Sequence, residues 1–256
     1  MNVIITGASG GIGRALAIEY SKNQARLFLF GRSKSELGIT ANLCVQHGGV
    51  VEVFEVDVTD FDGMKAALDE ICGRVKVDVV YANAGVSAGT SGGCESIFQI
   101  QKIIDVNING VVNTIEPVVS YMREWNSGHV VLISSMAGFV PLPSSPTYSA
   151  TKAFVRYYGN AIGILLKPFQ ISVTVVCPGY IRTKMTDVNK FPMPFLMSPE
   201  KAARIIINGV NKKKSIVAFP RRMYFAIQAL RFSGLSRFIL GFLLSKFPSK
   251  PAFQAD

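Results

Sequence analysis

The chain has 256 residues, of which 49% are apolar, and a formal net charge of +10. This length fits one large α/β domain with a substantial core and excludes a small disulfide-held secreted scaffold. Four scattered cysteines and two distant histidines, His47 and His129, show no metal-ligand spacing, so no metal is expected. The first strand is expected to start at residue 3, which leaves no room for a signal segment, and a reducing, cytoplasmic location is expected.

Seven short apolar runs predict strands, and helix-like stretches separate most of them. The runs cover residues 3–5, 27–30, 50–56, 77–81, 130–133, 171–176 and 215–219. This alternation predicts a Rossmann-like α/β fold, a doubly wound, mainly parallel seven-stranded sheet with helices on both faces. A ligand cleft is expected beyond the carboxyl ends of the strands.

A glycine-rich turn, from Thr6 to Gly13, joins the first expected strand to a helix. Its glycines are spaced Gly7-x3-Gly11-x-Gly13 and allow the backbone to approach a pyrophosphate group closely. The N-terminus of the helix adds unpaired N–H groups and a favourable dipole. Similar turns also occur without a nucleotide, so this motif alone leaves both interpretations open.

The second expected strand is followed by Gly31-Arg32-Ser33. In dinucleotide-binding folds an acidic residue near this point binds the ribose 2′-hydroxyl, whereas an arginine accommodates a 2′-phosphate. Arg32 therefore favours NADP(H), with NAD(H) kept open as the alternative. The competing interpretation is that Arg32 is a surface cation at the end of a strand.

Tyr148 and Lys152 are four residues apart and follow Ser135 by thirteen and seventeen residues. On a helix, residues four apart share a face, so the phenol and the ammonium can point into one cleft. An adjacent ammonium is expected to lower the pKa of the tyrosine, which could then exchange a proton with an alcohol or a ketone. A Tyr-x-x-x-Lys pair by itself also fits a solvated surface helix.

Further motifs follow one another in a characteristic order. They are Tyr81-Ala82-Asn83-Ala84-Gly85, Asn107 within residues 105–110, Ser134-Ser135 after an apolar run, Tyr148-Ser149-Ala150-Thr151-Lys152, and Cys177-Pro178-Gly179-Tyr180-Ile181-Arg182-Thr183. Together with the glycine turn they resemble the short-chain dehydrogenase/reductase (SDR) family over residues 1 to about 200. The resemblance implies an NAD(P)-dependent oxidoreductase that transfers a hydride between nicotinamide and a secondary alcohol or ketone.

The resemblance also implies roles for individual residues. The catalytic residues would be Asn107, which positions a water molecule, Ser135, which binds the reacting oxygen, Tyr148, the general acid/base, and Lys152, which binds the ribose and lowers the pKa of the tyrosine. The cofactor-binding residues would be Gly7, Ser9, Gly11, Ile12, Gly13, Arg32, Asp57, Val58, Asn83, Ala84, Gly85, Tyr148, Lys152, Pro178, Gly179, Ile181 and Thr183. Many NADP-preferring members carry a basic residue in the glycine turn where this chain has Gly10, so the cofactor preference depends on Arg32, with Arg14 as a weaker contributor.

The excess positive charge is concentrated at the C-terminal end. Residues 200–256 contain 11 basic and 2 acidic residues, a net charge of +9, and residues 221–247 are rich in aromatic and aliphatic side chains. We expect residues 1–220 to form the catalytic domain and residues 221–256 a helical extension of it, with helices at about 221–232 and 235–246. Residues 221–247 fit an anionic membrane interface, at the inner face of a membrane, or else a roof over the substrate pocket or a subunit contact. The many leucines and phenylalanines argue against nucleic acid.

Two other functions remain as alternatives to an oxidoreductase. One is a non-catalytic nucleotide-binding scaffold or sensor on the same fold, although the chain retains all four catalytic residue types. The other is an epimerase or dehydratase acting on a nucleotide sugar. If the tail meets a membrane, a hydrophobic, lipid-like carbonyl substrate is expected. A homo-oligomer, dimer or tetramer, is expected to pair through helices at about 100–124 and 148–166, as the family often does.

Overall fold

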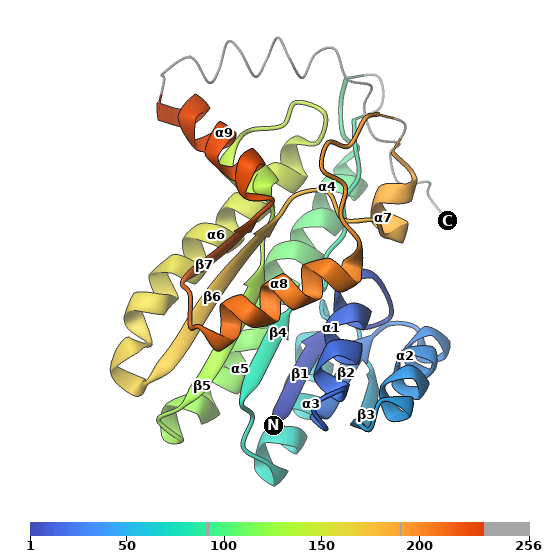
Figure 1. Cartoon of the computed structure of the whole chain (residues 1–256), viewed down its shortest axis with the longest axis vertical. Helices are drawn as coiled ribbons and strands as arrows, with labels where there is room; N and C mark the ends of the chain where they lie inside the picture. The colour runs from blue at the N-terminus through green and yellow to red at the C-terminus, as the bar shows by residue number, and fades with distance from the viewer. Residues whose placement is uncertain (91–92, 190, 233–256) are drawn as a thin grey trace.

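The structure, a computed structural model, describes residues 1–90, 93–189 and 191–232. Its centre is one sheet of seven parallel strands in the order β3-β2-β1-β4-β5-β6-β7 (Figure 1). The strands are β1 (Asn2–Thr6), β2 (Arg26–Gly31), β3 (Val50–Glu55), β4 (Val79–Ala82), β5 (Gly128–Ile133), β6 (Ile171–Pro178) and β7 (Ile216–Phe219). The expected parallel seven-stranded sheet is confirmed.

Helices cover both faces of the sheet. The longer ones are α1 (Gly11–Ser21), α2 (Lys34–Gln46), α3 (Phe61–Arg74), α4 (Ile97–Ile104), α5 (Gly110–Glu124), α6 (Pro146–Leu165), α8 (Pro199–Asn211) and α9 (Arg221–Phe232), and α7 (Lys184–Asp187) is a single turn. On one face α1 packs against α2 and α8, and on the other α3 packs against α5 and α4 against α6 (Figure 1).

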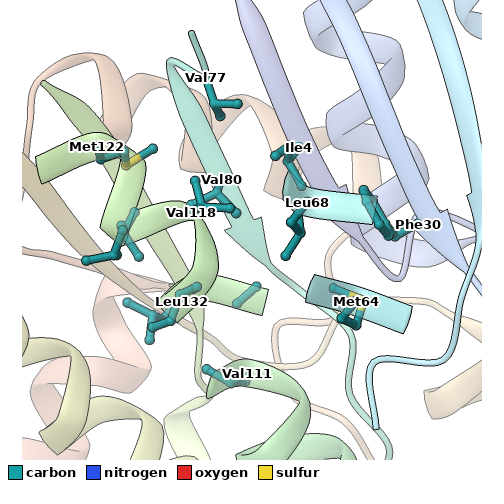
Figure 2. Close-up of a cluster of buried hydrophobic side chains, with 14 of the residues drawn as sticks. Ile4, Phe30, Met64, Leu68, Val77, Val80, Val111, Val118, Met122 and Leu132 are labelled. Atoms are coloured by element: carbon teal, nitrogen blue, oxygen red, sulfur yellow. The ribbon is translucent and has the colours of Figure 1, made fainter. Parts of the chain in front are cut away.

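Each face of the sheet has its own apolar core because strand residues point alternately to the two sides. Ile4, Phe30, Val80 and Leu132 face α3, α5 and α6, where they pack with Met64, Leu68 and Val118 (Figure 2). Val3, Ile5, Leu29, Tyr81 and Val131 face α1, α2 and α8. Burial on both sides explains why the central strands are apolar throughout, as expected of a parallel sheet.

The helix expected at about 100–124 contains a wider turn in its middle. Ser96 caps its start by accepting a hydrogen bond from the Gln99 N–H (3.2 Å). The π-helical turn η1 (Asp105–Asn109) separates α4 from α5 and carries Asn107 at its centre. Single π-helical turns of this kind often occur at functional sites.

The strand order reverses between β1 and β4, and this reversal positions the site. The loops that follow these two strands leave in opposite directions, which opens a crevice at the carboxyl edge of the sheet. α7 and α9 lie at this same edge (Figure 1). The expected helix at 221–232 agrees with α9, whereas the second expected helix, at 235–246, lies outside the described residues.

Candidate active site

A cleft of about 840 Å³ lies at the carboxyl edge of the sheet. Its walls come from the glycine turn after β1, the loops after β2, β4, β5 and β6, the start of α6, and α7 and α9. The predicted site residues that line it are Gly7, Ser9, Gly11, Ile12, Arg32, Asn83, Ala84, Gly85, Ser135, Tyr148, Lys152, Pro178, Gly179, Ile181 and Thr183. Arg14, the weaker candidate for binding the cofactor, lines it as well. The cleft therefore gathers most of the residues that the sequence motifs singled out.

The glycine turn is held in a shape that side chains would block. Gly7 and Gly11 have φ angles of +65° and +54°, which L-residues with a side chain rarely adopt. A Cβ atom on Gly13 would lie 2.3 Å from the Gly7 carbonyl oxygen, so only glycine lets α1 approach the turn this closely. Gly13 acts through this packing and does not itself line the cleft.

Asn83 ties the glycine turn to the loop after β4. Its Nδ2 donates hydrogen bonds to the carbonyl oxygens of Thr6 (2.8 Å) and Gly7 (3.3 Å). The Thr6 hydroxyl oxygen in turn accepts hydrogen bonds from the N–H groups of Asn83 (3.1 Å) and Ala84 (3.2 Å). The two loops on either side of the reversal point thus form one rigid floor.

The N-terminus of α1 fits a phosphate group. Gly10 at its N-cap position offers no side-chain hydrogen bond, and the first turn contains no acidic residue. A helix start without its own anionic cap leaves N–H groups and the positive end of the helix dipole for a bound anion. The residues present therefore fit the pyrophosphate of a dinucleotide.

Ser135, Tyr148 and Lys152 meet deep in the cleft. The Ser135 hydroxyl faces the Tyr148 phenol and favours its ionised form. Lys152, 4% exposed, places Nζ 5.8 Å from the centre of the Tyr148 ring and donates a hydrogen bond to the Ile133 carbonyl (3.0 Å). Three polar side chains, one from the loop after β5 and two from α6, thus lie around one point of the cleft.

Ser134, the neighbouring hydroxyl, has a different role. Its side chain is buried and donates a hydrogen bond to the Lys152 carbonyl (2.7 Å), while its N–H binds the Val176 carbonyl (2.8 Å). Ser134 therefore joins β5, β6 and α6, and Ser135 is the serine that contacts Tyr148. Ser135 is also the serine to which the family resemblance gives a catalytic role.

In the described structure the pKa of Tyr148 is shifted upward, in the direction opposite to the lowering expected from Lys152. Burial raises the pKa of Tyr148 above its ordinary value of 10, and the hydrogen bond from Ser135 offsets only part of this. Burial also lowers the pKa of Lys152 to about 8. Burial is the largest cause of the shift in both groups.

Asn107 lies behind the cleft rather than in its wall. Its Oδ1 accepts a hydrogen bond from the Val86 N–H (2.8 Å), and its Nδ2 donates to the Val86 carbonyl (3.0 Å) and to Thr151 Oγ1 (3.1 Å). A Cβ atom on Gly85 would lie 3.2 Å from both Asn107 Oδ1 and Lys152 Nζ. The absence of a side chain at Gly85 therefore lets Asn107 and Lys152 both approach this backbone position closely.

Asp57 and Val58 also lie outside the wall of the cleft. Asp57 binds the N–H and hydroxyl of Thr59, both at 2.9 Å, and its other oxygen is 3.9 Å from Arg32 Nη1. The Val58 side chain is buried in the core. Of these two residues, Asp57 is the one whose side chain interacts with a residue of the cleft wall, Arg32.

The half of the cleft away from the glycine turn is apolar. Its apolar lining residues, which accompany Ser144 and Ser145, are Met136, Ala137, Val140, Leu142, Tyr180, Phe191, Pro192, Pro194, Met223 and Ile227. Met223 and Ile227 come from α9, which packs on Phe139 through Tyr224 (ring centres 5.5 Å apart). The described part of the C-terminal extension is thus a wall of the cleft, an option that its amphipathic sequence had left open beside others.

The described residues contain no group of three or more histidine, cysteine, aspartate or glutamate side chains that could hold a metal ion.

Among the described helices, none combines the length and the apolar character that a membrane crossing requires. Cys44, Cys72 and Cys177 are buried free thiols.

Comparisons with known proteins place these features in a family. Residues 1–191 match the family model described as short chain dehydrogenase. An uncharacterized oxidoreductase of Myxococcus xanthus is 35% identical, with 85% of this chain and 86% of that protein covered. Mouse 17-beta-hydroxysteroid dehydrogenase 13 is 30% identical, with 85% and 73% covered.

Solved structures agree with this. A short-chain dehydrogenase from Sphingobium yanoikuyae in complex with NADPH superimposes with a TM-score of 0.80 at 26% identity, and the match covers 100% of this chain and 98% of that one. A 3-oxoacyl-[acyl-carrier protein] reductase from Brucella melitensis with bound NAD gives a TM-score of 0.74 at 27% identity, with 85% and 88% covered.

Proposed function

The chain belongs to the short-chain dehydrogenase/reductase family, and from that premise we propose that it transfers a hydride between NADP(H) and a hydrophobic secondary alcohol or ketone. The observation that carries this proposal is the meeting of Ser135, Tyr148 and Lys152 where the glycine-lined half of the cleft joins its apolar half. A carbonyl at this point would lie beside both the acid/base groups and the cofactor.

Tyr148 is the proposed general acid/base. Because burial raises its pKa, the phenol is protonated at neutral pH and can donate its proton to the oxygen of a ketone as that oxygen gains charge. The hydroxyl of Ser135, which faces the tyrosine hydroxyl, would donate a hydrogen bond to the same ketone oxygen and orient it. The bound nicotinamide supplies or accepts the hydride.

Lys152 is proposed to bind the nicotinamide ribose and to pass protons to Tyr148. Its pKa of about 8 lies close enough to neutrality for the ammonium to exchange a proton under ordinary conditions. The Asn107 amide is proposed to take part in the relay through a water molecule. In addition, its hydrogen bonds to Val86 and Thr151 support the loop that carries Gly85 next to Lys152.

NADP(H) is the proposed cofactor because of the charge at the end of β2. Arg32 lines the cleft, and its side chain is 59% exposed, with Asp57 as a distant partner at 3.9 Å. A loosely held guanidinium at this position can bind a 2′-phosphate in a charge-assisted manner. The NADPH in the Sphingobium yanoikuyae relative supports the proposal, whereas the NAD in the Brucella melitensis relative keeps NAD(H) as the alternative.

A hydrophobic substrate is proposed from the chemistry of the cleft. Apart from Lys152, the charged side chains that line it in the described part of the chain are Arg14, Arg32, Glu36 and Lys184, which lie at the end of the glycine turn. Apart from these residues and several uncharged polar ones, the wall is made of apolar side chains, which favour an apolar ligand through burial of surface. The similarity to a hydroxysteroid dehydrogenase supports a large, lipid-like carbonyl compound.

The test of this function is a spectrophotometric screen that follows oxidation of NADPH and of NADH with ketones from small and polar to lipid-sized. The proposal expects faster turnover with NADPH, and a kcat/KM that rises with the apolar surface of the ketone. Turnover restricted to small polar ketones would contradict the substrate class. A clear preference for NADH would contradict the cofactor assignment and leave the enzyme class unaffected.

We also propose that residues 221–247 contact an anionic membrane surface at its cytoplasmic face. Within the described residues, α9 exposes Arg221, Arg222 and Phe225, and Phe225 is 61% exposed. Basic and aromatic side chains on one segment are typical of an interfacial anchor. Co-sedimentation of the full chain with phosphatidylserine vesicles, compared with a chain ending at Phe232, tests the proposal, and equal pelleting would contradict a role for the residues after 232.

A homo-oligomer, dimer or tetramer, is proposed from the exposed apolar side chains of α4 and α6. Phe98 on α4 is 54% exposed, and Ile164 on α6 is 79% exposed. Exposed apolar groups on neighbouring helices favour contact with a second copy. Light scattering of the full chain and of Ile164→Glu tests this, and an unchanged mass in the variant would contradict a contact through this part of α6.

A further inference from the structure

One carboxylate holds cations from two other parts of the chain. The Glu36 carboxylate, in the first turn of α2, binds Lys184 Nζ from α7 (2.8 Å) and Arg14 Nη2 from α1 (2.7 Å). Lys184 is 148 residues away in the sequence, so only the fold brings it to Glu36. The two cations keep the pKa of the Glu36 carboxyl below its usual range, and Lys184 makes the larger contribution.

This ion pair crosses the cleft. Glu36 and Lys184 both line it, and they belong to opposite walls, the loop and helix after β2 and the segment after β6. The residue before Lys184, Thr183, places its Cγ2 methyl 3.0 Å from the position of a Cβ atom on Gly11. The segment that carries Lys184 thus lies over the glycine turn, at the end of the cleft where Arg14 and Arg32 also lie.

Arg14 is firmly placed in this corner. Its guanidinium donates a hydrogen bond from Nη2 to the Ser9 carbonyl (2.5 Å) and from Nε to Thr40 Oγ1 (2.9 Å), in addition to its pair with Glu36. The side chain of Arg14 is only 26% exposed. It therefore contributes a fixed positive charge directly beneath the glycine turn.

Lys184, in contrast, is held loosely. Its side chain is 87% exposed, so its ion pair with Glu36 is screened by solvent and is easily exchanged for another anion. The corner contains three cations, Arg14, Arg32 and Lys184, and two carboxylates, those of Glu36 and Asp57. A phosphate with a charge near −2 suits the excess of positive charge, and it would compete with Glu36 for Lys184.

We propose that Lys184 is a specificity-determining residue that closes over the 2′-phosphate of NADP(H), and that Glu36 competes with this phosphate for it. This inference rests on the proposed function, in that it takes a dinucleotide to occupy the cleft. It adds Lys184, from a segment far away in the sequence, to the two cations Arg14 and Arg32.

The test measures binding, with no substrate present. Kd values are determined by calorimetry for adenosine 2′,5′-bisphosphate and for ADP, with the full-length protein, Lys184→Met, Glu36→Gln and the control Lys65→Met. Lys65 also forms a solvent-exposed ion pair, with Asp69 on α3, and lies outside the cleft wall. Lys184→Met should raise the Kd for the bisphosphate about fivefold or more and leave that for ADP within about twofold, because only the bisphosphate carries the 2′-phosphate.

Glu36→Gln should lower the Kd for the bisphosphate about threefold or more, because it removes a competing negative charge and leaves all three cations in place. Lys65→Met should change neither Kd. Equal loss for both ligands in Lys184→Met would show that Lys184 binds another part of the nucleotide and would overturn the inference. Weaker bisphosphate binding in Glu36→Gln would overturn the competition.

The outcomes separate this inference from the proposed function. If the unaltered protein binds neither adenosine 2′,5′-bisphosphate nor NADPH, the cofactor assignment itself fails. If the unaltered protein binds the bisphosphate more tightly than ADP, the cofactor assignment stands. If Lys184→Met then shows the same two Kd values as the unaltered protein, the role of Lys184 is refuted. In 0.5 M salt the effect of Lys184→Met should shrink, as expected for an exposed charge.

Discussion

Lys152 Nζ lies 3.0 Å from the carbonyl oxygen of Ile133, the last residue of β5, and donates a hydrogen bond to it. This bond fixes the buried ammonium beside Ser135, which follows Ile133 by two residues, and below the ring of Tyr148. The register of α6 on the sheet, set by the Ser134 hydroxyl and the Lys152 carbonyl, therefore also sets the geometry of the groups that we propose to be catalytic. The packing of α6 on β5 and the positions of these polar groups therefore depend on each other.

Tyr148→Phe should reduce kcat by about 10²–10⁴-fold, because it removes the group that exchanges the proton. The ring remains, so the Kd for NADPH should change by less than about threefold. Steady-state kinetics and fluorescence titration measure the two quantities. Tyr157→Phe is the matched control, since Tyr157 lies on the same helix and is 63% exposed. Near-normal turnover in Tyr148→Phe would disprove the mechanism.

Lys152→Met should make the protein more stable near pH 7 while abolishing turnover. Burial lowers the folded-state pKa of Lys152 from 10.5 to about 8, so below pH 8 the folded protein carries a desolvated charge at a cost of about 3 kcal/mol. The lost hydrogen bond to Ile133 offsets part of the gain, and a net increase of about 1–2 kcal/mol is expected.

The difference in stability between Lys152→Met and the unaltered protein should depend on pH. Between pH 8 and 10.5 the unfolded chain binds more protons at Lys152 than the folded one, so the stability of the unaltered protein should rise relative to that of Lys152→Met. Urea unfolding at pH 7 and pH 9.5 measures the difference, which should narrow at the higher pH. A variant that is less stable at both values would show that the hydrogen bond outweighs the burial of charge.

Arg32→Ala should weaken NADPH binding about tenfold and leave NADH binding within about twofold, because a charge-assisted contact to the 2′-phosphate is worth roughly 1.4 kcal/mol or more. Arg74→Ala, which removes a guanidinium from an exposed ion pair on α3, serves as the control. Equal weakening of both nucleotides in Arg32→Ala would be evidence against a phosphate contact.

Glu95→Ala should destabilise the start of α6 and lower kcat. The Glu95 carboxylate accepts hydrogen bonds from the N–H (3.1 Å) and the hydroxyl of Thr147, the residue before Tyr148. Their loss should cost about 1–3 kcal/mol in unfolding free energy. kcat should fall several-fold, since the tyrosine is less firmly oriented, with the Kd for NADPH unchanged. Glu124→Ala, at an exposed helix end, is the control. An unchanged kcat in a folded Glu95→Ala protein would separate this cap from catalysis.

The order of the elements could be predicted from the sequence because it depends on local patterns. β-branched runs are buried on both faces of a parallel sheet, and glycines with positive φ form the turn after β1. The spacing of Ser135, Tyr148 and Lys152 likewise predicts that they meet, since one follows a central strand and the others share a helix face. Family membership followed from the same motifs and is confirmed by the comparisons.

Other properties arise only from packing. Whether Lys152 lowers the pKa of Tyr148 depends on how deeply both groups are buried, and burial reverses the direction expected from their adjacency. The pairing of Glu36 with Lys184 and the seating of Met223 and Ile227 in the cleft wall join segments far apart in the chain. The sequence by itself thus determined the sheet, the phosphate turn and the set of reactive groups, which are encoded in short stretches. The tertiary structure decided their protonation, their charge partners and the apolar wall, because solvation and long-range contacts exist only once the chain has folded.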